Sequence, residues 1–299
     1  MNIGVDICGI HFKNPVIAAS GTFGFGKEFA DYIDLDKLGG ICSKGLTLNK
    51  NLGNSGIRIH ETPSGIMNSI GLQNPGIEYF VNEELPFLLS KDTVTIANLG
   101  GHSVEDYVKG ANILDKTDVP MIELNISCPN VKEGGMAFGT DTSKASEVIS
   151  KVRKETKKPL IVKLSPNVGS IPTFAKLAED NGADAISLVN TFNAMAIDIN
   201  TEAPVFVNKT AGLSGPAIKP IALRMVYEAA HAVDIPVIGM GGIMDYKDAL
   251  EFIMAGASAI QVGTANFVDY NTMLDVADGI EKYLKENNIE DIKEITGII

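Results

Sequence analysis

The chain has 299 residues, of which 45% are hydrophobic and 21% charged, a composition typical of a globular protein and too apolar for a disordered one. Its 25 basic against 37 acidic residues give a net charge of −12, which disfavours nucleic acid or an anionic membrane as a partner. The three cysteines, Cys8, Cys42 and Cys128, are far apart, which argues against a disulfide framework and favours a reducing compartment. The first residues lack the features of a signal peptide, so we expect a cytoplasmic protein.

Eight short apolar runs have the continuous hydrophobicity of strands that are buried on both faces of a parallel sheet. They cover residues 16–20, 40–44, 93–98, 121–127, 160–165, 185–190, 237–240 and 259–263. Amphipathic segments alternate with these runs and predict helices. They cover residues 75–90, 104–116, 142–157, 171–181, 217–232, 246–255 and 271–286.

Alternation of this kind, repeated eight times, predicts a (β/α)8 TIM barrel. The competing fold is a doubly wound open sheet, which is disfavoured because an eighth unit is present and the glycines of 21–26 lack the dinucleotide-binding spacing. Three segments exceed a minimal barrel. We expect an N-terminal hairpin at 3–13, a loop at 49–72 and a further hairpin within 195–215. No linker interrupts the chain, so residues 1–299 are expected to form one domain.

Polar residues stand where six of the predicted strands end. Chemistry in a barrel collects at this face, and buried lysine or asparagine side chains there need polar partners, so a polar ligand at the barrel mouth is indicated. These residues are Ser20, Lys44, Asn98, Asn125, Lys163 and Asn190. Glycine-rich turns at 239–243 and 263–266 follow the last two strands, where barrel enzymes commonly bind phosphate through backbone N–H groups.

Cys128 lies just after the fourth predicted strand, in the run Asn-Ile-Ser-Cys-Pro-Asn of residues 125–130. A thiol at the rim of the barrel can meet a ligand, and its ordinary pKa of about 8.5 allows it to take up a proton. The alternative role is that of a small buried hydrophobic residue. That role suits Cys8 and Cys42, whereas the position of Cys128 favours catalysis.

Taken in order, the motifs resemble the dihydroorotate dehydrogenase family, the FMN enzymes of pyrimidine biosynthesis, over essentially the whole chain. The motifs are residues 19–26, 68–74, 125–130, 163–167, 212–215, 239–242 and 263–264. Cys128 stands where the quinone-using class carries serine, and residues 131–139 resemble the NAD-linked class 1B rather than the fumarate-using class 1A. This resemblance implies a homodimer of FMN subunits that carries two partner subunits with FAD and a 2Fe–2S cluster.

The resemblance also implies roles for individual residues. Cys128 is implied to remove a proton from C5 of dihydroorotate while N5 of FMN accepts a hydride from C6, with Lys163 near the N1/O2 edge of the flavin. Implied substrate-binding residues are Lys44, Asn68, Ser69, Ile70, Gly71, Leu72, Asn125, Asn190 and Thr191. Implied FMN-binding residues are Ser20, Lys44, Gly45, Asn98, Asn125, Lys163, Val189, Gly215, Gly241, Gly242, Gly263 and Thr264. No metal ion is expected.

Three alternatives remain open at this point. A lysine at a strand end, such as Lys163, is also the arrangement of a Schiff-base lyase. The chain could also use fumarate and act without a partner, as class 1A enzymes do, or it could be a non-catalytic binding subunit. Bound yellow flavin would exclude the lyase, and the electron acceptor would separate the two dehydrogenase classes.

Overall fold

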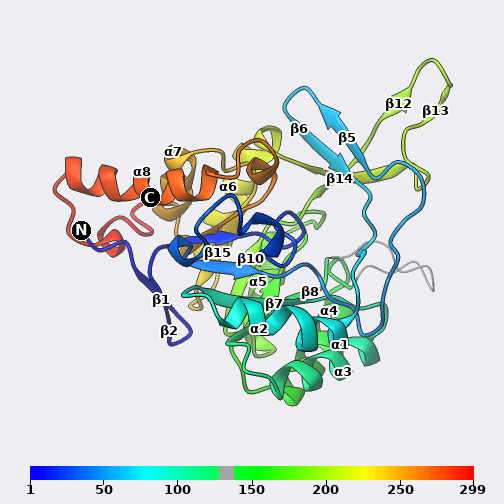
Figure 1. The fold of residues 1–299 in the computed structure, drawn as a ribbon, viewed down its shortest axis with the longest axis horizontal. Coiled ribbons are helices and arrows are strands. Elements are labelled where there is room, and N and C mark those ends of the chain that lie inside the picture. Colours follow the sequence, from blue (N-terminus) through cyan, green and yellow to red (C-terminus); the bar gives the residue numbers. More distant parts are fainter. Residues whose placement is uncertain (128–137) are drawn as a thin grey trace.

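A closed barrel of eight strands forms the centre of the computed structural model, which describes residues 1–127 and 138–299 (Figure 1). All neighbouring strands in the barrel are parallel, and β16 pairs with β3 to close it. In barrel order the strands are β3 (Val16–Ala18), β4 (Gly40–Cys42), β7 (Val94–Leu99), β8 (Met121–Asn125), β9 (Leu160–Lys163), β10 (Ala185–Leu188), β15 (Val237–Met240) and β16 (Ala259–Val262). The predicted fold and all eight predicted strands are therefore confirmed.

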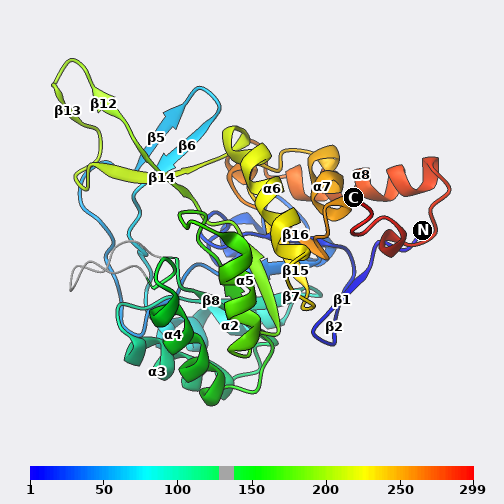
Figure 2. The same cartoon turned by 180° about the vertical axis from the view of Figure 1, so that it is seen from behind.

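Helices follow the strands and surround the barrel (Figures 1 and 2). The longer ones are α3 (Val104–Asp115), α4 (Thr142–Glu155), α5 (Ile171–Asp180), α6 (Lys219–Ala230), α7 (Tyr246–Met254) and α8 (Thr272–Glu286). Four of them begin at a side chain that accepts hydrogen bonds from the first turn, which is the usual way to satisfy free N–H groups there. These caps are Ser103, Asp141, Ser170 and Asp245.

The helix predicted at 75–90 is interrupted. It consists of α1 (Ile77–Tyr79), a π-turn (Phe80–Glu84) and α2 (Leu85–Leu89). Pro86 lies at the start of α2 and has no backbone N–H, so the regular hydrogen-bond ladder cannot continue through it.

Two antiparallel hairpins lie outside the barrel where hairpins were predicted. At the N-terminus β1 (Val5–Ile7) pairs with β2 (Ile10–Phe12) through a turn in which Cys8 has a φ of +53°. In the later segment β12 (Ile197–Asp198) pairs with β13 (Ala203–Pro204), flanked by β11 (Phe192–Met195) and β14 (Thr210–Ser214), which also pair.

The prediction of a loop at 49–72 is wrong, because this segment contains β5 (Ile59–Thr62) and β6 (Gly65–Asn68). These strands join β14 and β11 in a second sheet of order β11-β14-β6-β5. The residues of β5 alternate between exposed and half-buried, so the segment lacks the apolar run that marks a buried strand. Both views show the hairpins β5–β6 and β12–β13 projecting together from one side of the barrel (Figures 1 and 2).

A buried hydrogen bond connects the helical layer to the end of a barrel strand. The hydroxyl of Tyr107, on α3, donates to the backbone carbonyl oxygen of Asn125 at 2.9 Å. Tyr107 is fully buried, and Asn125 is the last residue of β8. The bond therefore fixes the point at which β8 leaves the barrel and the chain enters the mouth.

Replacing Tyr107 with phenylalanine is expected to lower the free energy of unfolding by about 1 kcal/mol, because a buried hydrogen bond is lost without a change in shape. Urea denaturation followed by circular dichroism measures this. Tyr79→Phe is the matched control: Tyr79 is 48% exposed, and its loss of a hydroxyl should leave the unfolding free energy unchanged. Equal stability of the two variants would contradict the prediction.

Candidate active site

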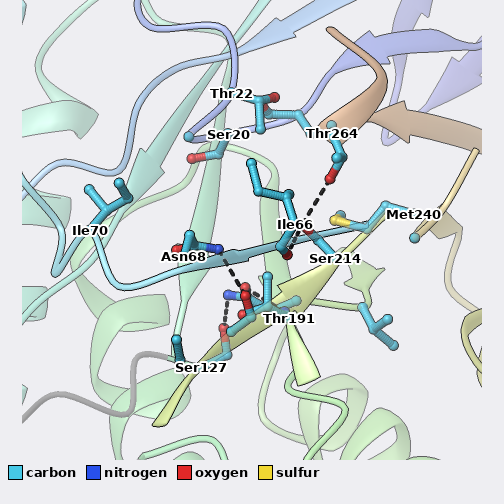
Figure 3. A pocket seen from close by; sticks show the side chains of 18 of the residues that line it. Ser20, Thr22, Ile66, Asn68, Ile70, Ser127, Thr191, Ser214, Met240 and Thr264 are labelled. Carbon is cyan, nitrogen blue, oxygen red and sulfur yellow. Dashed lines mark hydrogen bonds between the residues drawn. The ribbon is translucent and has the colours of Figure 1, made fainter. Parts of the chain in front are cut away.

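A cavity of about 670 Å³ opens at the carboxyl ends of the barrel strands, beside the second sheet (Figure 3). The loops that follow the strands meet there, because all strands of a parallel barrel point the same way. Of the predicted site residues that the structure describes, all line this cavity except Asn98. Cys128 lies outside the described residues, and Asn98 is buried beneath the cavity lining.

One corner of the cavity is built from glycine-rich backbone. Gly215 and Gly242 have φ values of +100° and +76°, a region that L-residues with side chains rarely adopt. A Cβ on Gly242 would lie 2.8 Å from the carbonyl oxygen of Gly215. Beside them Thr264 donates from its hydroxyl to Ser214 Oγ at 2.8 Å, a contact drawn in Figure 3. Because these glycines have no side chains, a ligand can approach their backbone N–H groups closely. Phosphate-binding turns require this close approach.

Amide and hydroxyl groups form a chain along another wall. Ser127 donates from Oγ to Asn125 Oδ1 at 2.7 Å, and Asn190 Nδ2 donates to Ser127 Oγ. On the strand β6, Asn68 Nδ2 donates to the carbonyl oxygen of Gly212 at 3.3 Å, and Figure 3 shows Asn68 near Thr191. Asparagine offers both donors and acceptors, so this wall suits a ligand that itself carries amide-like groups.

Asn167 holds the loop that carries Thr191. Its Nδ2 donates to the carbonyl oxygen of Thr191 at 3.0 Å, and its Oδ1 accepts from the backbone N–H of Asn193 at 2.9 Å. Sequence reasoning assigned no role to Asn167 or Ser127, although both line the cavity and both lie in quoted motifs. Their partners come from distant segments, so the motifs alone did not reveal this positioning.

Lys44 lines the cavity and is half-buried. Burial lowers the pKa of its ammonium group below the usual value. The charge of Glu28 opposes this change in pKa, and that of Arg58 adds to it. The Lys44 ammonium can pair with an anionic group of a ligand, and it loses its proton at lower pH than an exposed lysine does.

At the floor of the cavity a fully buried carboxylate, that of Glu123 on β8, lies on the inside of the barrel. Five side chains from five other barrel strands donate to it. The donors are Asn98 Nδ2 at 2.6 Å, Gln261 Nε2 at 2.7 Å, Ser187 Oγ at 2.8 Å, Cys42 Sγ at 3.3 Å and Lys163 Nζ at 3.4 Å. Strand register brings several of them together: Asn98 is level with Glu123, and Lys163 is level with Ser187.

This network sets the protonation of its members. Burial alone would raise the pKa of Glu123, but the charge of Lys163 and the hydrogen bonds from Gln261, Ser187 and Cys42 outweigh it, and the pKa lies below its usual value. Burial and the charge of Glu123 raise the pKa of the Cys42 thiol well above its usual value. Cys42 therefore remains a protonated donor, which adds a polar role to the packing role predicted for it.

Asn98 and Gln261 each retain a polar atom without a partner. Asn98 Oδ1 and Gln261 Oε1 are buried and accept no hydrogen bond from the described residues. Gln261 lines the cavity, and a Cβ on Gly45, another lining residue, would lie 3.0 Å from Asn98 Oδ1. Buried acceptors without a partner are rare in folded proteins, and the position of Gln261 in the cavity lining makes its Oε1 available to a donor group of a ligand.

Two further features concern residues 1–127 and 138–299 as a whole. Among them, no group of three or more His, Cys, Asp or Glu side chains could hold a metal ion. Within the same ranges, no helix has the length and apolarity needed to cross a membrane.

Comparison with known proteins agrees with this geometry. The family model for dihydroorotate dehydrogenase matches residues 2–284. The chain is 61% identical to the dihydroorotate dehydrogenase B (NAD(+)) catalytic subunit of Petrotoga mobilis over 99% of this chain and 98% of the relative. Proteins of the same name from Thermoanaerobacter pseudethanolicus and Bacteroides fragilis are 57% and 54% identical, covering 99% and 100% of this chain and 98% and 99% of the relatives.

Both the motifs and the comparisons lead to one assignment. The match extends over nearly the full length of the chain and of its relatives, so it covers the barrel and the second sheet alike. The chain belongs to the dihydroorotate dehydrogenase family and is a flavin-dependent oxidoreductase of pyrimidine biosynthesis.

Proposed function

We propose that residues 1–299 form one FMN-binding domain, the catalytic subunit of an NAD-linked dihydroorotate dehydrogenase, which oxidises dihydroorotate to orotate. The observation that carries this proposal is the meeting of separate motifs in one cavity. Residues from loops after β3, β4, β8, β9, β10, β15 and β16, together with the second sheet, line it. The printed names of the relatives at 54–61% identity support the NAD-linked class.

The cavity suits a flavin nucleotide in three respects. The backbone corner at Gly215, Gly242 and Thr264 suits a phosphate, since a Cβ there would clash with neighbouring backbone. The floor carries the ammonium of Lys163, which suits the electron-rich edge of a reduced flavin. The unpartnered Gln261 Oε1 suits a ring that also carries an N–H donor.

Bound FMN supplies the acceptor for the hydride that leaves C6 of the substrate. The chain itself holds the substrate. Asn68, Asn125 and Asn190 offer donors and acceptors to the pyrimidine ring, and Lys44 pairs with an anionic group. Asn167 and Ser127 keep this wall in place through the hydrogen bonds described above. Cys128 takes the proton from C5, and a thiolate is the form of the side chain that can do so.

A Schiff-base reaction at Lys163 is disfavoured by the geometry. The Lys163 side chain is buried and forms an ion pair with Glu123 at 3.4 Å. A Schiff base forms at the lysine nitrogen, and in this structure Glu123 contacts that atom.

The partner subunit is proposed to carry FAD and a 2Fe–2S cluster, within a heterotetramer built on a homodimer of this chain. The word "subunit" in the relatives' names supports a partner. The chain has three cysteines, fewer than the four thiolates that such a cluster commonly needs. The same scarcity of cysteine supports the cytoplasm as its location.

We expect the purified chain alone to reduce bound FMN with dihydroorotate but to transfer electrons to NAD+ only when the partner subunit is added. Stopped-flow absorbance of the flavin and NADH formation measure the two steps separately. Rapid turnover of dihydroorotate with fumarate by the chain alone would instead assign it to the fumarate-using class.

Cys128→Ala is expected to slow flavin reduction by dihydroorotate at least about 100-fold, the usual contribution of a positioned general base. FMN content should stay at the native level. Cys128→Ser should retain more activity than the alanine variant, because a hydroxyl can still accept a proton. Cys8→Ala is the matched control: Cys8 lies outside the cavity lining, and its replacement should leave the rate of flavin reduction unchanged. Native reduction rates in Cys128→Ala would overturn the assignment of the base.

Binding of orotate is expected to weaken as the pH rises through the lowered pKa of Lys44, because the anion loses its cationic partner. Lys44→Met should bind orotate about 10- to 100-fold more weakly at neutral pH, the effect of losing a charged hydrogen bond, and should lose this pH dependence. Titration of the flavin spectrum with orotate measures both. Lys50→Met, at an exposed lysine outside the cavity lining, should behave as the native protein. The same pH dependence in Lys44→Met and native protein would contradict this role.

A further inference from the structure

Glu123 touches no ligand position directly, because it does not line the cavity, yet it contacts two side chains that do. Lys163 and Gln261 both line the cavity and both donate to Glu123. The carboxylate lies beneath the floor of the cavity, at 0% exposure, and receives its donors from the opposite side of the barrel as well as from its neighbours. It thereby connects Lys163 and Gln261 to each other.

Stability alone does not account for this arrangement. The free-energy cost of removing a carboxylate and an ammonium from water offsets much of their mutual attraction. Well-packed apolar side chains commonly stabilise a core equally well. Apolar side chains flank the two central members of this set: Ile122 and Leu124 flank Glu123, and Ile260 and Val262 flank Gln261. The polar set is therefore confined to one level of the barrel, directly below the cavity.

The chemistry of a carboxylate gives this set a definite orientation. Both oxygens of an ionised carboxylate accept hydrogen bonds and neither donates. Gln261 must therefore turn Nε2 toward Glu123, and Asn98 must turn Nδ2 the same way. The amide oxygens of both side chains are then left unpartnered, as observed. The carboxylate thus decides whether Gln261 offers the ligand an acceptor or a donor.

We propose that Glu123 is a positioning residue for the flavin, which holds Lys163 as a cationic donor and Gln261 as an acceptor at the floor of the cavity. This proposal rests on the proposed binding of FMN. The pyrimidine part of a flavin carries carbonyl oxygens and ring nitrogens that accept hydrogen bonds, and one N–H that donates. A floor that offers a cationic donor together with an oriented acceptor is complementary to such a ring.

The test is a mutant cycle on FMN affinity, using flavin-free native protein and the variants Glu123→Gln, Lys163→Met/Gln261→Met and the triple variant that combines them. Titration with FMN, followed by quenching of flavin fluorescence, gives each Kd, and circular dichroism verifies the fold. We expect Glu123→Gln to bind FMN at least about 10-fold more weakly, because the new amide NH2 faces donors and displaces them. The triple variant should bind within about three-fold of Lys163→Met/Gln261→Met, since Glu123 acts through those two residues.

Glu84→Gln is the matched control. It neutralises another largely buried carboxylate, which pairs with Lys27 at 2.9 Å and does not line the cavity, so its Kd should stay within about three-fold of the native value. The absorption bands of bound flavin should shift in Glu123→Gln and not in Glu84→Gln, which a purely structural role of Glu123 does not require.

Native affinity in Glu123→Gln would overturn the proposal, as would a triple variant in which the loss of affinity equals the product of the losses in Glu123→Gln and Lys163→Met/Gln261→Met. If Glu123→Gln does not fold, the FMN affinity of Gln261→Met tests the proposal instead, because this variant keeps the Glu123–Lys163 ion pair. A folded Gln261→Met with native FMN affinity would overturn the proposal too. Absence of FMN binding in the native protein would contradict the proposed function itself, and so the two failures are distinguishable.

Discussion

A buried negative charge inside a closed barrel must be satisfied by the barrel itself, and this requirement governs the centre of the molecule. Glu123 meets it with donors from β4, β7, β9, β10 and β16. The strands must therefore hold a fixed register, because a slip of one residue would turn these side chains to the outer face. Fold and site are thus connected at one level of the barrel. The contacts that neutralise the charge of Glu123 also fix which polar groups of Lys163 and Gln261 face the cavity.

The walls of the cavity are built from different elements than its floor. The floor is made of side chains on rigid strands, whereas the walls are loops and the second sheet, held by asparagine and serine side chains such as Asn167 and Ser127. This division suits an oxidoreductase whose cofactor stays bound while substrate and product exchange. The rigid floor faces the proposed flavin ring, and the wall held by asparagine and serine side chains faces the proposed substrate.

The sequence predicted the barrel well because its strands are buried on both faces and read as continuous apolar runs. Nearly all the residues it predicted for the site line the cavity, since strand ends in a barrel converge on one face, and the family resemblance supplied those of the second sheet. It failed for β5 and β6, where alternation between exposed and half-buried residues left no such run. It failed for Glu123 because a polar residue within the run Met-Ile-Glu-Leu-Asn of β8 signals only that partners must exist. The identity of those partners depends on strand register and barrel closure, which no local pattern encodes.

The closure of the barrel between β3 and β16 has a consequence for the order in which the protein can be completed. These are the first and last strands of the barrel along the chain, and they pair directly. During synthesis, β3 leaves the ribosome more than two hundred residues before its partner on that side. The nascent barrel therefore has an open edge throughout most of translation, and such edges invite pairing with other chains. Only the emergence of β16 converts a curved, open sheet into the closed structure, and it brings Gln261 to Glu123 in the same step.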